Sequence, residues 1–271
     1  MGTGFSQTLL RRPGFEAAVI EATGAGATFP RHTHDDFVIA ANIEGAERIW
    51  LDGRWLEAAA GDVTAYDPGA LQASQGMAGA GSRWRFVSLY AEPAFVAQAL
   101  GLPAPPPLGA PVRRDPVLLR RFAELGRMIA GPDGTEDGAE DGRAEEIAVA
   151  ILAATVGGGA TARPAPPGDA VVRRAAAMLL DRLGNPPSLA AVAAEVGVSR
   201  EHLVRRFGAV HGMPPMAWAL QRRVARARTW LRRGMPPAEV AAMLGFADQA
   251  HLTRAFRQAM GTTPGRYRAR T

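Results

Sequence analysis

The second half of the chain contains one pattern twice. Val192-Ala-Ala-Glu-Val-Gly197 matches Val240-Ala-Ala-Met-Leu-Gly245 at an offset of 48 residues. One residue is then inserted, and the match continues at an offset of 49 through His202 with His251, Leu203 with Leu252, Arg205 with Arg254, Phe207 with Phe256, Gly212 with Gly261 and Pro215 with Pro264. A repeat that keeps glycine, aliphatic residues and phenylalanine at fixed steps predicts one supersecondary unit used twice.

Each copy predicts a short helix, a glycine turn and a second helix. Ser188 and Ser199 are suited to cap the two helices of the first copy, and Asp248 the second helix of the second copy. A helix-turn-helix of this length is the DNA-binding layout, in which the second helix enters the major groove. The alternative is an ordinary helical hairpin repeat without nucleic acid.

The charge distribution favours DNA binding. All 31 basic residues are Arg. Residues 1–163 hold 14 Arg and 20 acidic residues, a net charge of −6, whereas residues 164–271 hold 17 Arg and 6 acidic residues, a net charge of +11. A scaffold repeat does not need this excess of positive charge, and a polyanion-binding one does. The contrast also predicts two domains with different partners.

Helical spacing assigns the faces of the two second helices. Leu203, Phe207 and Val210 form the expected buried stripe of the first, and Leu252 and Phe256 that of the second. The opposite face presents Glu201, Val204, Arg205 and Gly208 in the first copy and Ala250, Thr253, Arg254 and Arg257 in the second. The two outward sets occupy the same positions of the repeat.

These outward positions are the candidate DNA-binding residues. Arg205 and Arg254 are equivalent, and Arg can bond guanine O6 and N7 together, which gives about 1–3 kcal/mol of discrimination. Gln249 can read adenine. Arg200 and Arg206 border the reading face and are assigned to phosphate contacts, which position the protein without specifying sequence.

A long connector is expected between the two copies. The connector, residues 215–233, would span about 29 Å, close to the roughly 34 Å between successive major-groove faces on one side of DNA. It carries part of the positive charge, on Arg222, Arg223, Arg226, Arg228, Arg232 and Arg233.

The first hundred residues indicate β-structure. Apolar runs at 37–41 and 85–90 alternate with turn signals, and Asp52-Gly53 predicts a hairpin. Many short strands favour a sandwich or small barrel. Helices are predicted over 116–130 and 144–156, with a loop at 131–142 between them.

The predicted fold class is α+β, with a β-barrel and flanking helices over 1–160, a linker over 161–168 and an all-α domain over 169–271. The composition of 157–168 marks the linker. The helices expected after it cover 170–183, 188–196, 200–211, 215–233, 237–244 and 249–260.

The C-terminal block resembles the AraC/XylS family of bacterial transcription regulators. The resemblance covers about a hundred residues, through the stretch from Ser188 to Phe207, the stretch Gly245-Phe-Ala-Asp-Gln-Ala-His-Leu-Thr-Arg-Ala-Phe256, and Gly261-Thr-Thr-Pro-Gly-Arg-Tyr-Arg268. It implies sequence-specific DNA binding by two helix-turn-helix units joined by a long helix. It also implies base-reading roles for Glu201, Val204, Arg205, Gln249, Ala250 and Arg254. Glu201 could accept from cytosine N4 or face solvent.

The N-terminal block resembles the cupin-type sensor domain common in that family, through Pro30-Arg-His-Thr-His34, Gly45, Gly61-Asp62 and Asp67-Pro-Gly69. The resemblance implies a barrel that binds a small effector, followed by helices that mediate dimerisation. Candidate effector-binding residues are His32, His34, Trp50, Tyr66 and Gln72. Trp50, Trp55, Trp84 and Tyr66 could instead form core.

His32 and His34 also raise the question of a metal site, because two imidazoles on one face of a strand suit a metal ion. Catalytic cupins add a carboxylate four or five residues later and a further histidine, but Val38, Ile39 and Gln72 occupy those places here. Two ligands do not make a site, so we expect no metal, no cofactor and no enzyme activity. A metal-dependent cupin enzyme joined to a DNA-binding domain is the alternative.

The complete absence of cysteine excludes disulfide scaffolds, thiolate metal sites and a DNA-repair alkyl acceptor. There is no apolar run of about 18 residues, and the first twelve residues lack the apolar run of a secretion signal. The sequence therefore predicts a cytoplasmic, effector-controlled transcription regulator. Its partners would be promoter DNA, an effector, a second copy in a homodimer and, for an activator, RNA polymerase.

Overall fold

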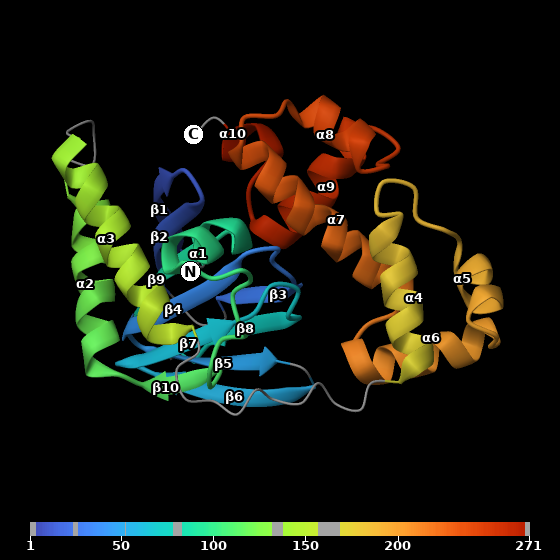
Figure 1. The fold of residues 1–271 in the computed structure, drawn as a ribbon, viewed down its shortest axis with the longest axis horizontal. Helices are drawn as coiled ribbons and strands as arrows, with labels where there is room; N and C mark the ends of the chain where they lie inside the picture. Colours follow the sequence, from blue (N-terminus) through green and yellow to red (C-terminus); the bar gives the residue numbers. More distant parts are fainter. Residues whose placement is uncertain are drawn as a thin grey trace. The chain divides into compact units, whose positions relative to one another are not determined.

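The computed structural model describes residues 4–23, 27–51, 53–77, 83–131, 138–156 and 169–268. The chain divides into two compact units, one built mainly from residues 1–163 and the other mainly from residues 164–271. The first is a two-sheet unit with helices and the second is wholly helical (Figure 1), so the expected α+β class is confirmed. Within the described residues, no helix is both long and apolar enough to cross a membrane.

The first unit contains two sheets. The larger has the strand order β1-β2-β9-β4-β7-β10 and the smaller the order β3-β8-β5-β6. The strands are β1 Gly4–Arg12, β2 Phe15–Thr23, β3 Thr28–His32, β4 Phe37–Glu44, β5 Ala46–Leu51, β6 Arg54–Ala59, β7 Asp62–Tyr66, β8 Gln72–Gly76, β9 Arg83–Ala91 and β10 Val112–Arg114. The predicted hairpin joins β5 to β6, and Gly53 adopts the positive φ of +87° that its turn requires. Asp52 lies outside the described residues.

Helices cover one face of the larger sheet (Figure 1). They are α1 Pro93–Leu100, α2 Pro116–Ala130 and α3 Gly138–Thr155. Leu118, Phe122 and Leu125 of α2 are buried in one core with Val87 and Leu89 of β9. A side chain at Gly126 would lie 2.8 Å from Val87, so this glycine allows α2 to approach the sheet closely.

Two expectations about these helices need correction. Helix α2 has the predicted bounds, but α3 begins at Gly138, inside the segment expected to be a loop. One reason is tertiary, since Arg143 of α3 pairs with Glu124 of α2 at 2.6 Å. Another is local, since Arg143 also pairs with Glu146 one turn further along α3, at 3.5 Å. The glycine-rich composition signalled a loop, whereas these contacts favour helix. Helix α1 was not expected.

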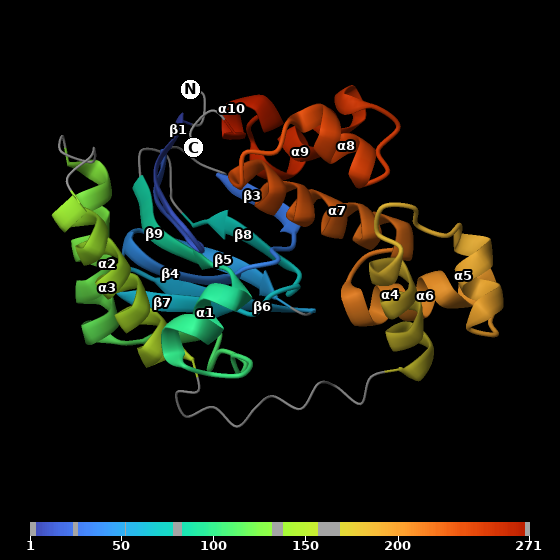
Figure 2. The same ribbon diagram turned by 45° about the horizontal axis from the view of Figure 1, so that its top comes forward.

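The second unit is two helical clusters joined by a long helix (Figure 2). Its helices are α4 Ala170–Asp181, α5 Leu189–Glu195, α6 Arg200–His211, α7 Pro215–Arg232, α8 Pro237–Met243, α9 Gln249–Met260 and α10 Pro264–Arg268. One core combines α4, α5, α6 and the start of α7 around Phe207. The other combines the rest of α7 with α8, α9 and α10 around Phe256. The predicted helices occur with the same or nearly the same bounds. The predicted linker 161–168 lies outside the described residues, and the domain limits remain a prediction.

Candidate functional site

The two helix-turn-helix units are shaped by the caps that the sequence places at their helix ends. Ser199 Oγ accepts from the His202 backbone N–H at 3.2 Å, and Asp248 Oδ1 accepts from that of His251 at 2.6 Å. Helices α6 and α9 each end at a left-handed glycine, Gly212 or Gly261, both at φ +68°. Equal starts and equal ends give two helices of 12 residues each, α6 and α9, which are the predicted reading helices.

The predicted faces of α6 and α9 agree with the structure except at one position. Leu203, Phe207, Leu252 and Phe256 are fully buried. Val210, expected in the buried stripe, is 39% exposed. It lies in the last turn of α6, where the chain reaches Gly212, and the core around Phe207 does not extend to it.

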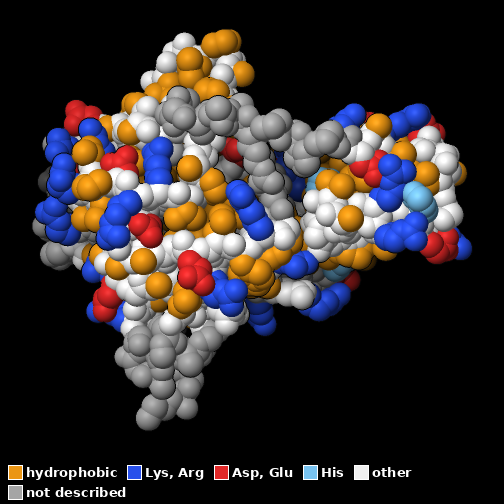
Figure 3. Space-filling model, turned by 90° about the horizontal axis from the view of Figure 1, so that it is seen from below, with side chains coloured by type: hydrophobic (Ala, Val, Ile, Leu, Met, Phe, Trp, Pro, Cys, Tyr) orange, Lys and Arg blue, Asp and Glu red, His pale blue; other side chains and the backbone are white. Residues whose placement is uncertain are grey.

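The candidate reading residues lie largely on the open faces. Those that are exposed are Arg200, Glu201, Arg205, Gln249, Ala250, Arg254 and Arg257. Val204 and Thr253 are half-buried, and Thr253 Oγ1 donates to the Gln249 carbonyl at 2.8 Å. Basic side chains stand out on the lobe formed by α4, α5 and α6 (Figure 3). The structure thus presents Arg205 and Arg254 at matching exposed positions of two matching helices.

Glu201 brings a negative charge to the reading face of α6. A hydrogen bond from its own backbone N–H, together with the Ser199 hydroxyl and the nearby Arg200, lowers the pKa of its carboxyl. Glu201 is therefore ionised at neutral pH. An ionised carboxylate repels phosphate and can accept only from a base donor such as cytosine N4.

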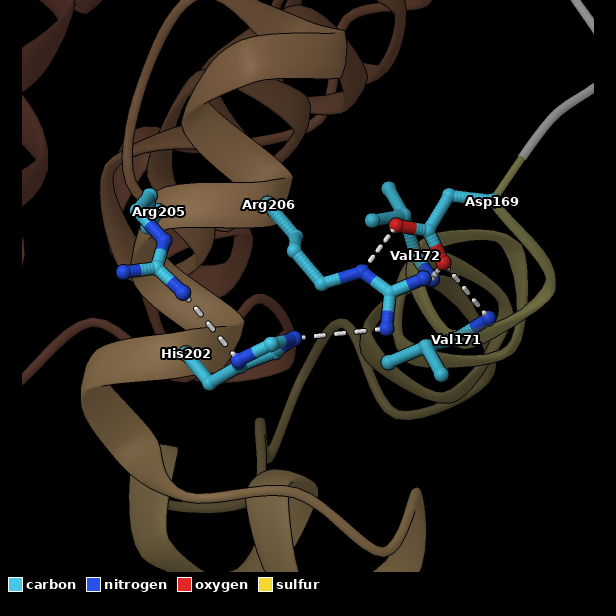
Figure 4. A network of polar contacts seen from close by, with 6 residues as sticks. All are labelled: Asp169, Val171, Val172, His202, Arg205 and Arg206. Atoms are coloured by element: carbon cyan, nitrogen blue, oxygen red, sulfur yellow. Dashed lines mark hydrogen bonds and ion pairs between the residues drawn. The ribbon is translucent and has the colours of Figure 1, made fainter.

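A polar network fixes the arginines of α6 (Figure 4). Arg206 Nε donates to Asp169 Oδ2, and Arg206 and Arg205 each lie beside one ring nitrogen of His202, at 3.4 and 3.3 Å. Asp169 also caps α4, accepting from the backbone N–H groups of Val171 and Val172 at 3.1 and 3.4 Å. Arg206 thus points toward the start of α4, while Arg205 stays on the open face. A phosphate contact for Arg206 would have to compete with Asp169.

The charge of Asp169 suits this role. Partial desolvation raises the pKa of its carboxyl, but hydrogen bonds from Arg206, Val172 and Val171 lower it more, so the net pKa is lowered. The carboxylate is thereby kept ionised at the N-terminus of α4, where a negative charge is favourable. The sequence did not indicate this pairing, because 37 residues separate Asp169 from Arg206.

We expect Asp169→Ala to loosen α4, because it removes both the helix cap and the partner of Arg206. Hydrogen exchange of the α4 amides, measured on the full chain by mass spectrometry, should speed up about three- to tenfold, the effect of losing one N-cap. The control is Arg206→Met, which keeps the cap and should give a smaller change. Equal effects from both variants would show that the cap bonds contribute nothing.

Several arginines of the connector α7 serve the fold and do not form a basic surface. Arg223, Arg228 and Arg232 are buried. Arg223 Nη1 donates to the Gly245 carbonyl at 3.0 Å and lies over the Phe246 ring, 5.1 Å from its centroid. Arg228 Nε donates to Tyr267 Oη at 2.9 Å. These contacts hold the turn between α8 and α9 and the last helix, α10. The count of charges did not predict this role.

The candidate effector residues do not form one group, because Trp50, Tyr66 and Gln72 belong to the first unit whereas His32 and His34 fall in the second. The rings of His32 and His34 meet edge to face, with centroids 4.8 Å apart, and His32 Nδ1 donates to the Pro30 carbonyl at 2.7 Å. Burial lowers the pKa of both rings. Trp50 is buried, but strand alternation places it on the face of β5 opposite Glu47. Trp55 does not line the interior, since it is 51% exposed beneath Arg48.

Tyr66 and Gln72 belong to a buried polar cluster that the sequence analysis missed. Glu47, with Asn42 and Ser74 bonded to it, lies close to Tyr66. The signal was present in β5, where Glu47 alternates with the buried Ile49 and Leu51. In the part of the chain that the structure describes, no three metal-ligating side chains come together.

Comparison with known proteins gives the same two parts. The family described as AraC-like ligand binding domain matches residues 15–152, and a helix-turn-helix domain matches residues 192–270. The transcriptional activator VirF of Yersinia enterocolitica is 33% identical over 81 residues, 30% of each chain. The arabinose operon regulatory protein of Escherichia coli K12 is 32% identical over 106 residues, which are 38% of this chain and 36% of that protein.

Those matches span about a third of the length of either relative. A crystal structure of ToxT from Vibrio cholerae O395 shares the fold, with a TM-score of 0.53 and 11% identity over 96% of this chain and 98% of that one. The ligand-binding family alone covers half of the chain. The chain therefore belongs to the AraC family, with an AraC-like ligand-binding domain followed by a helix-turn-helix domain.

Proposed function

We propose that the protein is a sequence-specific transcription regulator whose two reading helices, α6 and α9, enter successive major-groove segments of promoter DNA. The observation that carries the proposal is the exposed Arg205 and Arg254 at equivalent positions of the two helices. Helix α7 has 18 residues and is about 27 Å long. A connector of that length suits two reading helices spaced by about one turn of DNA.

The reading assignments follow from exposure and chemistry. Arg205 and Arg254 read guanine, Gln249 reads adenine, and Glu201, Val204, Ala250 and Thr253 complete the reading faces. Arg200 and Arg257 contact phosphate and orient the protein. Arg206 takes this role only by exchanging Asp169 for a phosphate oxygen.

The first unit would sense a small-molecule effector that changes promoter occupancy. The family match of residues 15–152 supports this role, as do the polar side chains buried between its sheets. The proposal includes action in the cytoplasm, homodimerisation, and contact with RNA polymerase if the protein activates transcription. Regulatory relatives favour this assignment over the alternative of a metal-dependent enzyme. Stoichiometric iron, manganese or zinc in the purified protein would favour the enzyme.

The test is selection of bound fragments from genomic DNA, followed by binding measurements with Arg254→Ala. We expect this variant to weaken binding of the selected sequence by about 1–3 kcal/mol and to relax the preference at one base position. Sequences that differ at that position should lose much less. The slope of affinity against salt should change little.

The matched control is Arg174→Ala, because Arg174 is also an exposed arginine of the helical unit but lies on α4, where it pairs with Glu195 of α5, and not on α6 or α9. It should leave affinity and base preference unchanged. Equal losses on every DNA sequence for Arg254→Ala would contradict base reading by Arg254. Failure of the protein to enrich any fragment would contradict the proposed function.

A further inference from the structure

The interior between the two sheets of the first unit holds buried polar side chains among apolar ones such as Val38, Ala40 and Phe86. In the larger sheet, residues alternate between the helix-covered core, such as Leu89, and the opposite face. The opposite face carries Asn42, Thr64, Tyr66, Trp84, Ser88 and Tyr90, all buried. Asn42 Nδ2 on β4 donates to Glu47 Oε1 on β5 at 3.1 Å, so this face meets the smaller sheet.

Glu47 is a buried carboxyl without a cationic partner among the described residues. It is 5% exposed, and the side chains that hydrogen-bond it are Ser74 and Asn42. Burial raises the pKa of Glu47 to about 7, and the two hydrogen bonds only partly offset this. The adjacent Arg48 is exposed and pairs weakly with Glu57 at 3.8 Å. By contrast Glu16, also fully buried, is paired with Arg11 at 2.7 Å.

Gln72 adds an acceptor that lacks a donor. Its side chain is 5% exposed, and its Oε1 has no hydrogen-bond partner in the described structure. Gln72 and Ser74 are two residues apart on β8, so strand alternation places both on the same face. Ser74 bonds to Glu47, so Gln72 faces the same interior. Buried acceptors without donors are costly and rare in native proteins.

A buried carboxyl without a cationic partner and a buried amide oxygen without a donor, both among the described residues, define the ligand chemistry. A carboxylate and an amide oxygen both accept N–H bonds, and the carboxylate also favours a positive charge. The ring of Tyr66 lies on the same face and can stabilise a cation through its π-electrons. Trp84 stacks on Phe86, with ring centroids 4.7 Å apart. An anionic ligand would meet repulsion from Glu47. A neutral polyol would leave that charge uncompensated.

We propose that the interior of the first unit binds a small organic cation, whose N–H groups are taken by the Glu47 carboxylate and the Gln72 amide oxygen. This proposal rests on the proposed function, in which the same unit senses an effector. It goes further by assigning the charge of that effector and the residue that selects it.

The test uses three probes of similar shape and different charge. Phenethylamine, 2-phenylethanol and phenylacetate are titrated into the full chain by calorimetry at pH 8. We expect the amine to bind at least tenfold more tightly than the other two. Its affinity should fall about tenfold at pH 6, because Glu47 is then mostly protonated while an alkylamine, with a pKa near 10, remains charged.

Glu47→Gln should remove both the preference for the amine and its pH dependence. Glu57→Gln is the matched control, because Glu57 is an exposed glutamate on the neighbouring strand β6 and should have no effect. Tyr66 and Tyr90 are titratable groups close to the same site, and burial raises the pKa of Tyr66 well above the tested range.

Several outcomes would overturn the proposal. They are equal or tighter binding of the alcohol or the acid, unchanged amine binding by Glu47→Gln, and no binding of the amine at millimolar concentration. DNA occupancy is measured separately on the same samples. Effector-dependent DNA binding that ignores Glu47 would overturn this inference and leave the proposed function standing. Amine binding by a chain that binds no DNA would support this inference and contradict the proposed function.

Discussion

Gly245→Ala should destabilise the helical unit by about 2–5 kcal/mol, whereas Gly197→Ala, at the equivalent position of the other repeat, should lose about 1–2 kcal/mol. Both glycines lie in the turn of a helix-turn-helix and both have positive φ, +66° and +73°. A side chain in this conformation costs about 1–2 kcal/mol at either site. The sites differ in what the new Cβ atom would meet.

At Gly245 the added Cβ would lie 2.0 Å from the carbonyl oxygen of Gly184, whereas at Gly197 nothing lies within 4 Å. Gly184 follows α4, so the clash falls between the end of α4 and the turn that joins α8 to α9. The turn cannot move freely to relieve it, because Arg223 donates to the Gly245 carbonyl at 3.0 Å. Overpacking of this kind adds about 1–3 kcal/mol.

Urea unfolding of the full chain gives the change in stability for each variant. Hydrogen exchange then locates it: in Gly245→Ala the amides of α8 and α9 should exchange faster, and in Gly197→Ala only those of α5 and α6. We also expect Gly245→Ala to weaken DNA binding more than Gly197→Ala, because α9 follows the displaced turn. Equal stability losses at the two sites would show that the close approach to Gly184 carries no strain.

The helix-turn-helix bounds could be predicted because their signals are local. Ser199 and Asp248 cap the reading helices and Gly212 and Gly261 end them, so a residue and its structural consequence lie within one turn. Because the pattern occurs twice, each capping residue and each terminal glycine has a counterpart in the other copy. Helix α1 was missed since it is short and its capping position, Glu92, makes no side-chain hydrogen bond to the helix.

Helical periodicity predicted which residues of the candidate site are exposed, but it did not predict contacts between residues distant in sequence. Spacing placed Arg205 and Arg254 on open faces, but the orientation of Arg206 depends on Asp169, which is distant in sequence. Similarly, six connector arginines look alike in sequence, yet Arg228 is buried against Tyr267. A count of charges cannot distinguish a guanidinium that serves packing from one left for phosphate.

The sensor interior was the least predictable part. His32 and His34 were predicted as candidates because paired histidines resemble a metal-binding motif, whereas a single glutamate in a strand carries no comparable signal. Alternation with Ile49 places Glu47 inside, but that no arginine of the described residues pairs with it depends on where side chains such as Arg48 point. That is a property of the three-dimensional arrangement, and it has a consequence for stability.

The first unit of the wild-type protein should become less stable as the pH rises from about 4.5 through 7, and Glu47→Gln should not show this loss. Burial raises the pKa of Glu47 from 4.5 to about 7 in the folded protein. Between these values the folded state keeps a proton that the unfolded state releases, so the free energy of unfolding falls as pH increases. The full difference is about 3 kcal/mol, since each pKa unit corresponds to about 1.4 kcal/mol.

This dependence runs opposite to that of an ion-paired carboxylate, whose contribution to stability appears as the pH rises. The measurement is hydrogen exchange of peptides from β4 and β9 at pH 5, 6, 7 and 8, corrected for the intrinsic effect of pH on exchange. The difference between wild type and Glu47→Gln should grow with pH, with the variant relatively more stable at pH 8. Glu57→Gln, which changes an exposed carboxyl on β6, should follow the wild type throughout.

Parallel curves for wild type and Glu47→Gln would mean that Glu47 is ionised in the folded state at low pH. A cation that binds in the interior should restore the lost stability at pH 8, because a ligand that binds the folded state alone stabilises it.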